Sequence, residues 1–266
     1  MDAKVRCLRS NDVQGPSVSC DLLHLRMAMV GDMAERILLC LFSCHEYSYT
    51  LAGMKDYFDR PIVDRVQGIR DSWLKDVTCD YKIFKGFGQG RTPPQDEVDL
   101  PCLDDYFHSA DKLRAMFKYA LDKGYDRVFK IDDDCFLWYD RLMQNIPTAD
   151  YVGSGRGWDV ETSKRFPTIF APGFSVWYSK KAMEILMKSP VGIFAEDRWA
   201  GESLYRAGIH LTTDYRFHLC RPTKTNQWIS DSELYKPNDW LSVHSMSPQQ
   251  MIQYHKSLKP SLYATS

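Results

Sequence analysis

The chain has 266 residues, a formal net charge of −1 at pH 7 and 26% charged residues, a size that fits one α/β domain with its own core. Because the charges are spread along the sequence, no basic surface strong enough to hold a polyanion is predicted, which argues against a nucleic-acid partner. Aromatic residues make up 13% of the chain, and aromatic faces in concave sites suit the apolar faces of sugar rings and nucleobases.

The first 33 residues mix charges with Ser, Gly and Pro in no clear period. Residues 1–33 are therefore predicted to be an N-terminal extension, and residues 34–266 the folded domain. This opening segment lacks the continuous apolar stretch of a signal peptide or membrane anchor, so no membrane segment is expected in this chain. The eight cysteines show no C-x-x-C spacing of a zinc site and are interpreted as mostly reduced, buried thiols.

Strands and helices alternate through the first half of the domain. The apolar run 36–43 predicts a central strand buried on both faces, and residues 59–73 predict a helix with apolar residues at helical spacing. Residues 81–84 are expected to form a second strand, followed by a Gly- and Pro-rich loop over 86–101. A helix over 109–124 completes this half, ending at a glycine.

The second half repeats the alternation, beginning with a strand over 127–131. The further predicted elements are a helix at 138–145, strand segments at 151–154 and 168–178 (the latter interrupted by Pro172-Gly173), and helices at 179–188 and 196–207. This order predicts the α/β fold class, as a single domain with a mostly parallel mixed central sheet flanked by helices.

Three consecutive carboxylates, Asp132, Asp133 and Asp134, follow the strand 127–131. Ligands of open parallel sheets bind at the carboxyl ends of strands, so a site is expected here. A divalent cation among the acids would relieve their repulsion, and oxygen ligands suit Mg²⁺ or Mn²⁺. Alternation along an extended segment predicts that Asp132 and Asp134 share one face while Asp133 points away. The alternative is a solvated acidic turn.

Four blocks between about residues 36 and 245 carry a further signal. They are Arg65-Val-Gln-Gly-Ile-Arg-Asp-Ser-Trp73, Lys130-Ile-Asp-Asp-Asp-Cys-Phe136, the segment from Phe166 to Ser179, and Glu196-Asp-Arg-Trp-Ala-Gly201 with Leu204 and Gly208-Ile209. In this order they resemble the I-R-x-T-W, K-x-D-D-D-x-F, Y-P-x-Y-x-x-G-x-G-Y-x-L-S and E-D-V-x-x-G-x-x-L-x-x-x-G-I motifs of the beta-1,3-galactosyltransferase and Fringe-like glycosyltransferases. Ser72 stands where that family has Thr, and Pro172 where it often has a small residue.

The resemblance implies a single GT-A domain over 34–266, with a Rossmann-like nucleotide-binding half and an acceptor half. It implies an inverting transferase that moves galactose, N-acetylglucosamine, glucose or xylose from a UDP-sugar to a hydroxyl of a glycan or glycoprotein acceptor. Such a transfer needs a base for the acceptor hydroxyl and an electrophile for the leaving diphosphate. The resemblance gives the role of base to Asp197, for which a helix cap is the alternative.

For the metal, the resemblance implies Asp134 as the direct ligand, Asp132 close by or through water, and a late histidine. His244 is the best candidate, and the competing histidines are His210, His218 and His255. An imidazole beside carboxylates favours Mn²⁺ over Mg²⁺, because nitrogen ligands suit the softer ion.

For the UDP-sugar, five further residues are expected in the donor site. Ser43 follows the first strand, where a uridine would lie, and Arg70 would meet a phosphate or the uracil, with a helix-surface salt bridge as its alternative role. Asp133 would meet the ribose or the donor sugar, and Gly173 would let the backbone approach that sugar. Glu196, beside Asp197, is grouped with these donor-site residues.

Two other functions compete with sugar transfer. A metal-dependent phosphohydrolase also uses clustered carboxylates, and a catalytically inactive carbohydrate-binding protein of the same fold would keep the cleft without the chemistry. The sequence leaves the oligomeric state open. It predicts a soluble protein of a microbial or viral cytoplasm, and the alternative is a lumenal catalytic domain whose membrane anchor has been removed.

Overall fold

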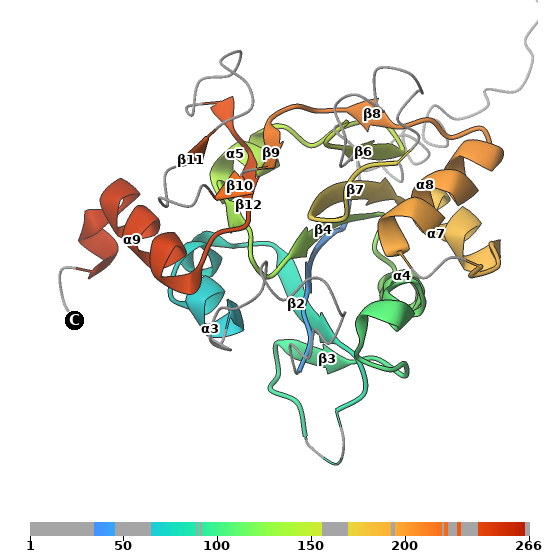
Figure 1. Cartoon of the computed structure of the whole chain (residues 1–266), viewed down its shortest axis with the longest axis horizontal. Coiled ribbons are helices and arrows are strands. Elements are labelled where there is room, and N and C mark those ends of the chain that lie inside the picture. The colour runs from blue at the N-terminus through green and yellow to red at the C-terminus, as the bar shows by residue number, and fades with distance from the viewer. Residues whose placement is uncertain are drawn as a thin grey trace, which may run out of the picture. The chain divides into compact units, whose positions relative to one another are not determined.

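The computed structural model describes residues 35–45, 65–88, 90, 92–155, 170–192, 195–219, 221–222, 228–229 and 239–263 (Figure 1). These described residues belong to one compact unit. The expected extension 1–33, the start of the helix predicted at 59–73 and residues 168–169 lie outside the described residues. Within the described ranges, no helix has the length and apolar character needed to cross a membrane.

A seven-stranded sheet, in the order β3-β2-β1-β4-β7-β6-β8, forms the centre of this unit. Its strands are β1 (Ile37–Phe42), β2 (Asp80–Lys85), β3 (Glu97–Asp99), β4 (Arg127–Asp132), β6 (Tyr151–Gly153), β7 (Ser175–Ser179) and β8 (Thr212–Thr213). β7 runs antiparallel to both of its neighbours, and the other pairings are parallel. This mostly parallel mixed sheet confirms the predicted α/β fold class.

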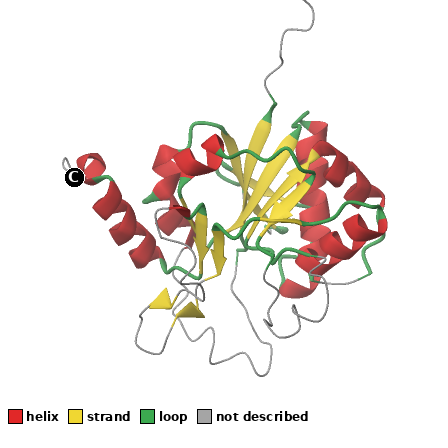
Figure 2. Cartoon of the chain, turned by 90° about the horizontal axis from the view of Figure 1, so that it is seen from above, coloured by secondary structure: helices red, strands yellow, loops and turns green. Residues whose placement is uncertain are grey.

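Helices cover both faces of the sheet (Figure 2). One face carries α4 (Ser109–Asp122), α7 (Lys180–Lys188) and α8 (Glu196–Arg206). The other carries α3 (Arg65–Arg70) and α5 (Tyr139–Gln144), and α9 (Pro248–Leu258) packs against α3. β1 shows the reason, because alternate residues of a strand point to opposite faces. Leu38 and Cys40 join the core under α4, whereas Leu39 and Leu41 join the core under α3.

A smaller sheet brings the C-terminal region to the end of β4. Its central strand β12 (Ser242–His244) is antiparallel to β5 (Phe136–Leu137) and parallel to β9 (Phe217–Leu219). A separate two-stranded ladder joins β10 (Arg221–Pro222) to β11 (Trp228–Ile229). None of these strands was predicted from the sequence, because two or three residues are too few to show a period.

Three predicted elements need correction. The loop expected at 86–101 contains β3, an edge strand of three residues. Its Glu97 is buried and forms ion pairs to Arg70 at 2.9 Å and to Lys85 at 3.1 Å. The helix expected to reach residue 73 ends at Arg70, and Trp73–Asp76 form a separate 3-10 turn. The strand expected over 168–178 begins only at Ser175, because the chain turns at Gly173. The other predicted strands and helices are confirmed to within a few residues.

Candidate active site

The three acids lie where β4 ends and the chain turns. The amide N of Cys135 donates to the carbonyl O of Asp132 at 3.2 Å, so extended geometry stops at Asp132. The predicted alternation of the three side chains therefore does not hold. Asp133 and Asp134 both face the guanidinium Nη1 of Arg65, at 3.3 and 3.7 Å, whereas the Asp132 carboxylate contacts the ammonium of Lys130.

Asp134 and His244 form the first grouping. The Nε2 atom of His244 lies 3.3 Å from Oδ1 of Asp134, and the Cys135 thiol completes a set whose ligand atoms all fall within 4.8 Å of one another. Two ligands at right angles and about 2.1 Å from an ion are about 3 Å apart, so the carboxylate and the imidazole fit one divalent cation. This oxygen and nitrogen pair suits Mn²⁺.

Cys135 is the weaker member of this set. Its side chain is fully buried, and burial raises the pKa of the thiol well above its ordinary value, with Asp134 adding to the effect. The neutral Sγ donates to the carbonyl O of Phe174 at 3.4 Å. Metals bind the thiolate form, so Asp134 and His244 are the better ligands.

Two contacts hold the imidazole of His244, and the turn that follows it is bonded to Asp134. Its Nδ1 lies 2.9 Å from Oγ of Ser245, and its ring stacks on Phe174 with centroids 5.0 Å apart. Ser245 has a φ of 68°, in the left-handed region that costs a non-glycine residue energy. The next residue, Met246, donates its amide N to the carbonyl O of Asp134 at 2.8 Å. These contacts direct Nε2 toward Asp134.

The competing histidines have other partners. His210 packs edge-on against Tyr205 at 5.2 Å between centroids, His218 stacks on Trp240 at 4.4 Å, and His255 pairs with Asp76 at 3.1 Å. Among the four candidates, His244 is the one that the structure brings to the acidic triplet.

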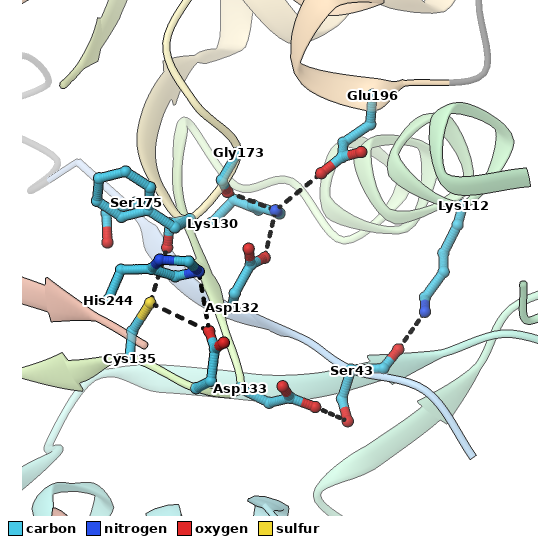
Figure 3. Close-up of polar contacts among 12 residues, drawn as sticks. Ser43, Lys112, Lys130, Asp132, Asp133, Cys135, Gly173, Ser175, Glu196 and His244 are labelled. Atoms are coloured by element: carbon cyan, nitrogen blue, oxygen red, sulfur yellow. Dashed lines mark hydrogen bonds and ion pairs between the residues drawn. The ribbon is translucent and has the colours of Figure 1, made fainter. Parts of the chain in front are cut away.

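Lys130 lies at the centre of the second grouping (Figure 3). Its Nζ donates to Oδ1 of Asp132 and to the carbonyl O of Gly173, both at 2.5 Å, and lies 3.4 Å from Oε1 of Glu196. The ammonium also sits 4.4 Å above the ring of Phe42. Burial lowers the pKa of Lys130, but Asp132 and Glu196 outweigh burial, so the pKa lies above its ordinary value. Lys130 is therefore charged.

Two acids of this grouping hold protons more tightly than usual. Burial raises the pKa of Asp132 to about 6, with Lys130 opposing the shift and Glu196 adding to it. Burial, followed by the charge of Glu196, raises the pKa of Asp197 to about 7. Asp197 is the second residue of α8, and its Oδ1 accepts the amide of Arg198 at 2.6 Å, while the N-cap position belongs to Ala195. A carboxylate near half-ionisation at neutral pH suits a general base.

The end of β1 supplies the third part of the site. Oγ of Ser43 donates to Oδ2 of Asp133 at 2.7 Å, and the carbonyl O of Ser43 accepts the ammonium of Lys112. Lys112 in turn pairs with Asp104 at 2.8 Å. Ser43 and Asp133 are thus held together by a direct hydrogen bond, and their place in a donor site stays a prediction.

Arg70 lies with other partners. Its guanidinium donates to Asp96 at 2.9 and 3.0 Å and to Glu97 at 2.9 Å. The structure thus gives Arg70 the salt-bridge role that the sequence left open as the alternative. Arg65, at the start of the same helix, takes the place beside the acidic triplet, because a helix that follows a strand begins at the carboxyl edge of the sheet.

Gly173 lies close to the ends of two charged side chains. A Cβ atom built there would lie 2.5 Å from Oε1 of Glu196 and 3.2 Å from Nζ of Lys130. The bare backbone therefore admits the Glu196 carboxylate to the ammonium. Lys130, Arg65 and Lys112 were not identified from the sequence, although Lys130 was within reach, since residues 130 and 132 of one strand share a face.

No family model matches the chain, and no curated protein matches it. Among solved structures, it is similar to a glycosyltransferase involved in the glycosylation of the major capsid of PBCV-1, with 11% identity, a TM-score of 0.43 and coverage of 83% of this chain and 99% of that chain. It is also similar to a CMP:2-keto-3-deoxy-manno-octonic acid synthetase complexed with CTP. The identity is 11%, the TM-score is 0.40, and the match covers 68% of this chain and 89% of that chain. A third similar structure is a mutant Drosophila beta-1,4-galactosyltransferase 7 in complex with manganese, UDP-Gal and xylobiose. The identity is 12%, the TM-score is 0.37, and the match covers 74% of this chain and 71% of that chain. Identities this low concern the fold alone.

Proposed function

We propose that the chain is an inverting, metal-dependent glycosyltransferase that transfers a sugar from a UDP-sugar to a hydroxyl of a glycan acceptor. The observation that carries this proposal is the division of the acidic triplet between two groupings. Asp134 with His244 forms a pair suited to one divalent cation. Asp132 lies with Lys130 and Glu196, beside an Asp197 whose pKa is raised to about 7.

The first grouping is proposed to receive the diphosphate of the donor. A Mn²⁺ ion held by Asp134 and His244 would supply Lewis-acid stabilisation to the leaving UDP. Arg65 reaches Asp133 and Asp134 from the adjoining helix, and its guanidinium is proposed to donate hydrogen bonds to phosphate oxygens. Ser43 and Asp133, hydrogen-bonded to each other at the ends of β1 and β4, are proposed to meet the nucleoside.

The second grouping is proposed to activate the acceptor. The ionised Asp197 accepts the proton of the acceptor hydroxyl, while the acceptor oxygen forms its bond to the anomeric carbon and the bond from that carbon to the UDP oxygen breaks. The electron pair leaves with UDP, and the proton stays on Asp197. A base with a pKa of about 7 is matched to this task near neutral pH.

The rival phosphohydrolase mechanism uses two metal ions held by two sets of carboxylates. Asp132 and Glu196 are a second set, but the ammonium of Lys130 lies between them. This arrangement supports a site with one divalent ion, and so favours sugar transfer over two-metal hydrolysis.

A panel of UDP-galactose, UDP-N-acetylglucosamine, UDP-glucose and UDP-xylose with Mn²⁺, scored in parallel for released UDP and for inorganic phosphate, tests the proposal. We expect slow UDP release from at least one donor, no phosphate, and no activity after chelation with EDTA. Phosphate release from UDP or p-nitrophenyl phosphate would contradict it in favour of the hydrolase. Mn²⁺-dependent UDP binding without turnover of any donor would favour a carbohydrate-binding protein.

A further inference from the structure

Lys130 is a charged side chain in an unusual place. It is 1% exposed, and a buried ammonium is costly unless acidic or carbonyl oxygens surround it. Its three oxygen partners come from three elements that are far apart in the sequence: Asp132 at the end of β4, Gly173 in the turn before β7, and Glu196 at the first position of α8 (Figure 3). The cation therefore joins the strand that bears the acidic triplet to the helix that bears Asp197.

The surroundings of Lys130 match those of a metal ion. Carboxylates lie on two sides, a carbonyl oxygen lies on a third, and the ring of Phe42 closes a further side at 4.4 Å. Hard divalent cations take this kind of oxygen set. The packing is also tight, since a methyl group on Gly173 would lie 2.5 Å from the Glu196 carboxylate.

We propose that the Lys130 ammonium is a built-in second cation of the site, occupying the place that a two-metal enzyme gives to its second ion. It acts as a positioning residue: it ties Asp132 to Glu196, fixes the first turn of α8 with Asp197 beside the triplet, and limits divalent binding to Asp134 and His244. This inference rests on the proposed function for its catalytic consequence, whereas its effect on metal stoichiometry does not.

The first experiment titrates the protein with Mn²⁺ and follows free Mn²⁺ by electron paramagnetic resonance. The wild-type chain is expected to bind one ion at this site. Lys130→Met keeps the length of the side chain but leaves Asp132 and Glu196 without their cation, so one additional Mn²⁺ should bind per chain. Lys130→Arg retains the positive charge and should bind a single ion. Lys85→Met is the matched control, since Lys85 is also buried and pairs with Glu97 at 3.1 Å.

The second experiment separates donor binding from catalysis on the same preparations. With Mn²⁺ at a level that fills the Asp134–His244 site alone, Lys130→Met should lower kcat by about 10-fold or more while the affinity for UDP with Mn²⁺ changes by less than about 3-fold. A displaced base affects the transition state and not donor binding. Lys130→Arg should recover part of kcat. Lys85→Met should keep both values near those of the wild type.

Gly173→Ala tests the same tie without removing a charge, and it also serves if Lys130→Met fails to fold. The added methyl group displaces Glu196 from Lys130, so kcat should fall while Mn²⁺ binding stays at one ion. An unchanged kcat in Gly173→Ala would overturn the positioning role.

A single Mn²⁺ in Lys130→Met, with kcat and UDP affinity lost in equal measure, would overturn the inference. Failure of the proposed function gives a different pattern. The wild type would then turn over none of the four UDP-sugars, yet a second Mn²⁺ in Lys130→Met would still support the role of Lys130 as a resident cation.

Discussion

The Asp134 side and the Asp132 side of the acidic triplet begin two residues apart at one strand end, and they differ in what neutralises their charge. Asp134 and His244 are 19% and 21% exposed at the side chain, so a cation from solvent can reach and leave them. On the other side the neutralising cation is part of the chain, since Lys130 is 1% exposed. On the proposed function, the difference separates an exchangeable cation, which would bind the donor, from a permanent cation, which would position the base.

Asp134→Ala should give the largest effect, and it should remove metal binding at Asp134 and His244 without disturbing the Lys130 side of the triplet. Loss of the carboxylate ligand is expected to lower Mn²⁺-dependent UDP affinity by more than about 100-fold, because even partners that only support a metal ligand are worth 10- to 100-fold. The fold should persist, since a partly exposed acid at a strand end contributes little to the core. Calorimetric titration with UDP and Mn²⁺ measures the effect, and Asp140→Ala serves as an exposed acidic control. Unaltered metal-dependent affinity would exclude Asp134 as ligand.

Asp197→Asn should remove the proposed base beside Lys130 and leave metal binding at Asp134 and His244 intact. The amide keeps the size of the side chain but cannot take the acceptor's proton, so kcat should fall by about 10²-fold or more while donor affinity stays nearly unchanged. The measurement needs the transfer rate and the UDP affinity of one preparation, with Glu202→Gln in the same helix as control. Near-normal transfer by the Asn variant would shift suspicion to Glu196.

Most of the fold could be predicted because its larger elements are periodic. β1 has apolar residues on both faces, and α4 repeats apolar residues along one side, so both are visible in the sequence. β5, β9 and β12 have two or three residues each and carry no such signal. The path that brings His244 to Asp134 runs through β12 and therefore could not be derived from periodicity.

The site was predictable where it follows from strand ends and not where it depends on side-chain contacts between distant segments. The acidic triplet follows a buried strand, and its place at the carboxyl edge could be stated from the sequence. Arg65 and Arg70 lie in one short helix, and only the direction of that helix decides which of them faces the acids. The contact of Lys130 with Glu196 joins residues 66 positions apart, and no local pattern predicts it.

The pH dependence of transfer should sharpen the comparison, because the base role proposed for Asp197 requires its carboxylate to be ionised. With a pKa of about 7, its ionised fraction falls about 10-fold for each pH unit well below 7. The rate should therefore rise with pH through about 7 and level off above it. Rates from pH 5.5 to 8.5 at saturating Mn²⁺ and donor measure this limb. The residual activity of Asp197→Asn should not rise with pH in this range. The same rise in that variant would show that another group titrates.

Substitution of Ser245 should have the smallest effect, and it tests how the proposed metal ligand His244 is oriented. Its Oγ lies 2.9 Å from Nδ1 of His244, and a proton on Nδ1 that is donated to this hydroxyl leaves the Nε2 lone pair for a metal. Ser245→Ala removes the hydrogen bond and should weaken Mn²⁺ binding by about 3- to 10-fold, at or below the lower end for such partners, because Phe174 still holds the ring.

Ser245→Gly separates this effect from backbone strain, since the residue has a φ of 68° that glycine adopts without the cost of about 1 to 2 kcal/mol borne by other residues. Both variants lack the hydroxyl, so both should lose the same Mn²⁺ affinity in the titration. Their stabilities should diverge, with the Gly variant melting at a higher temperature than the Ala variant. If the Gly variant instead recovered the affinity, the backbone conformation and not the hydroxyl would orient His244. Metal binding at Asp134 and His244 would then depend on the turn in which the amide of Met246 bonds to the carbonyl of Asp134.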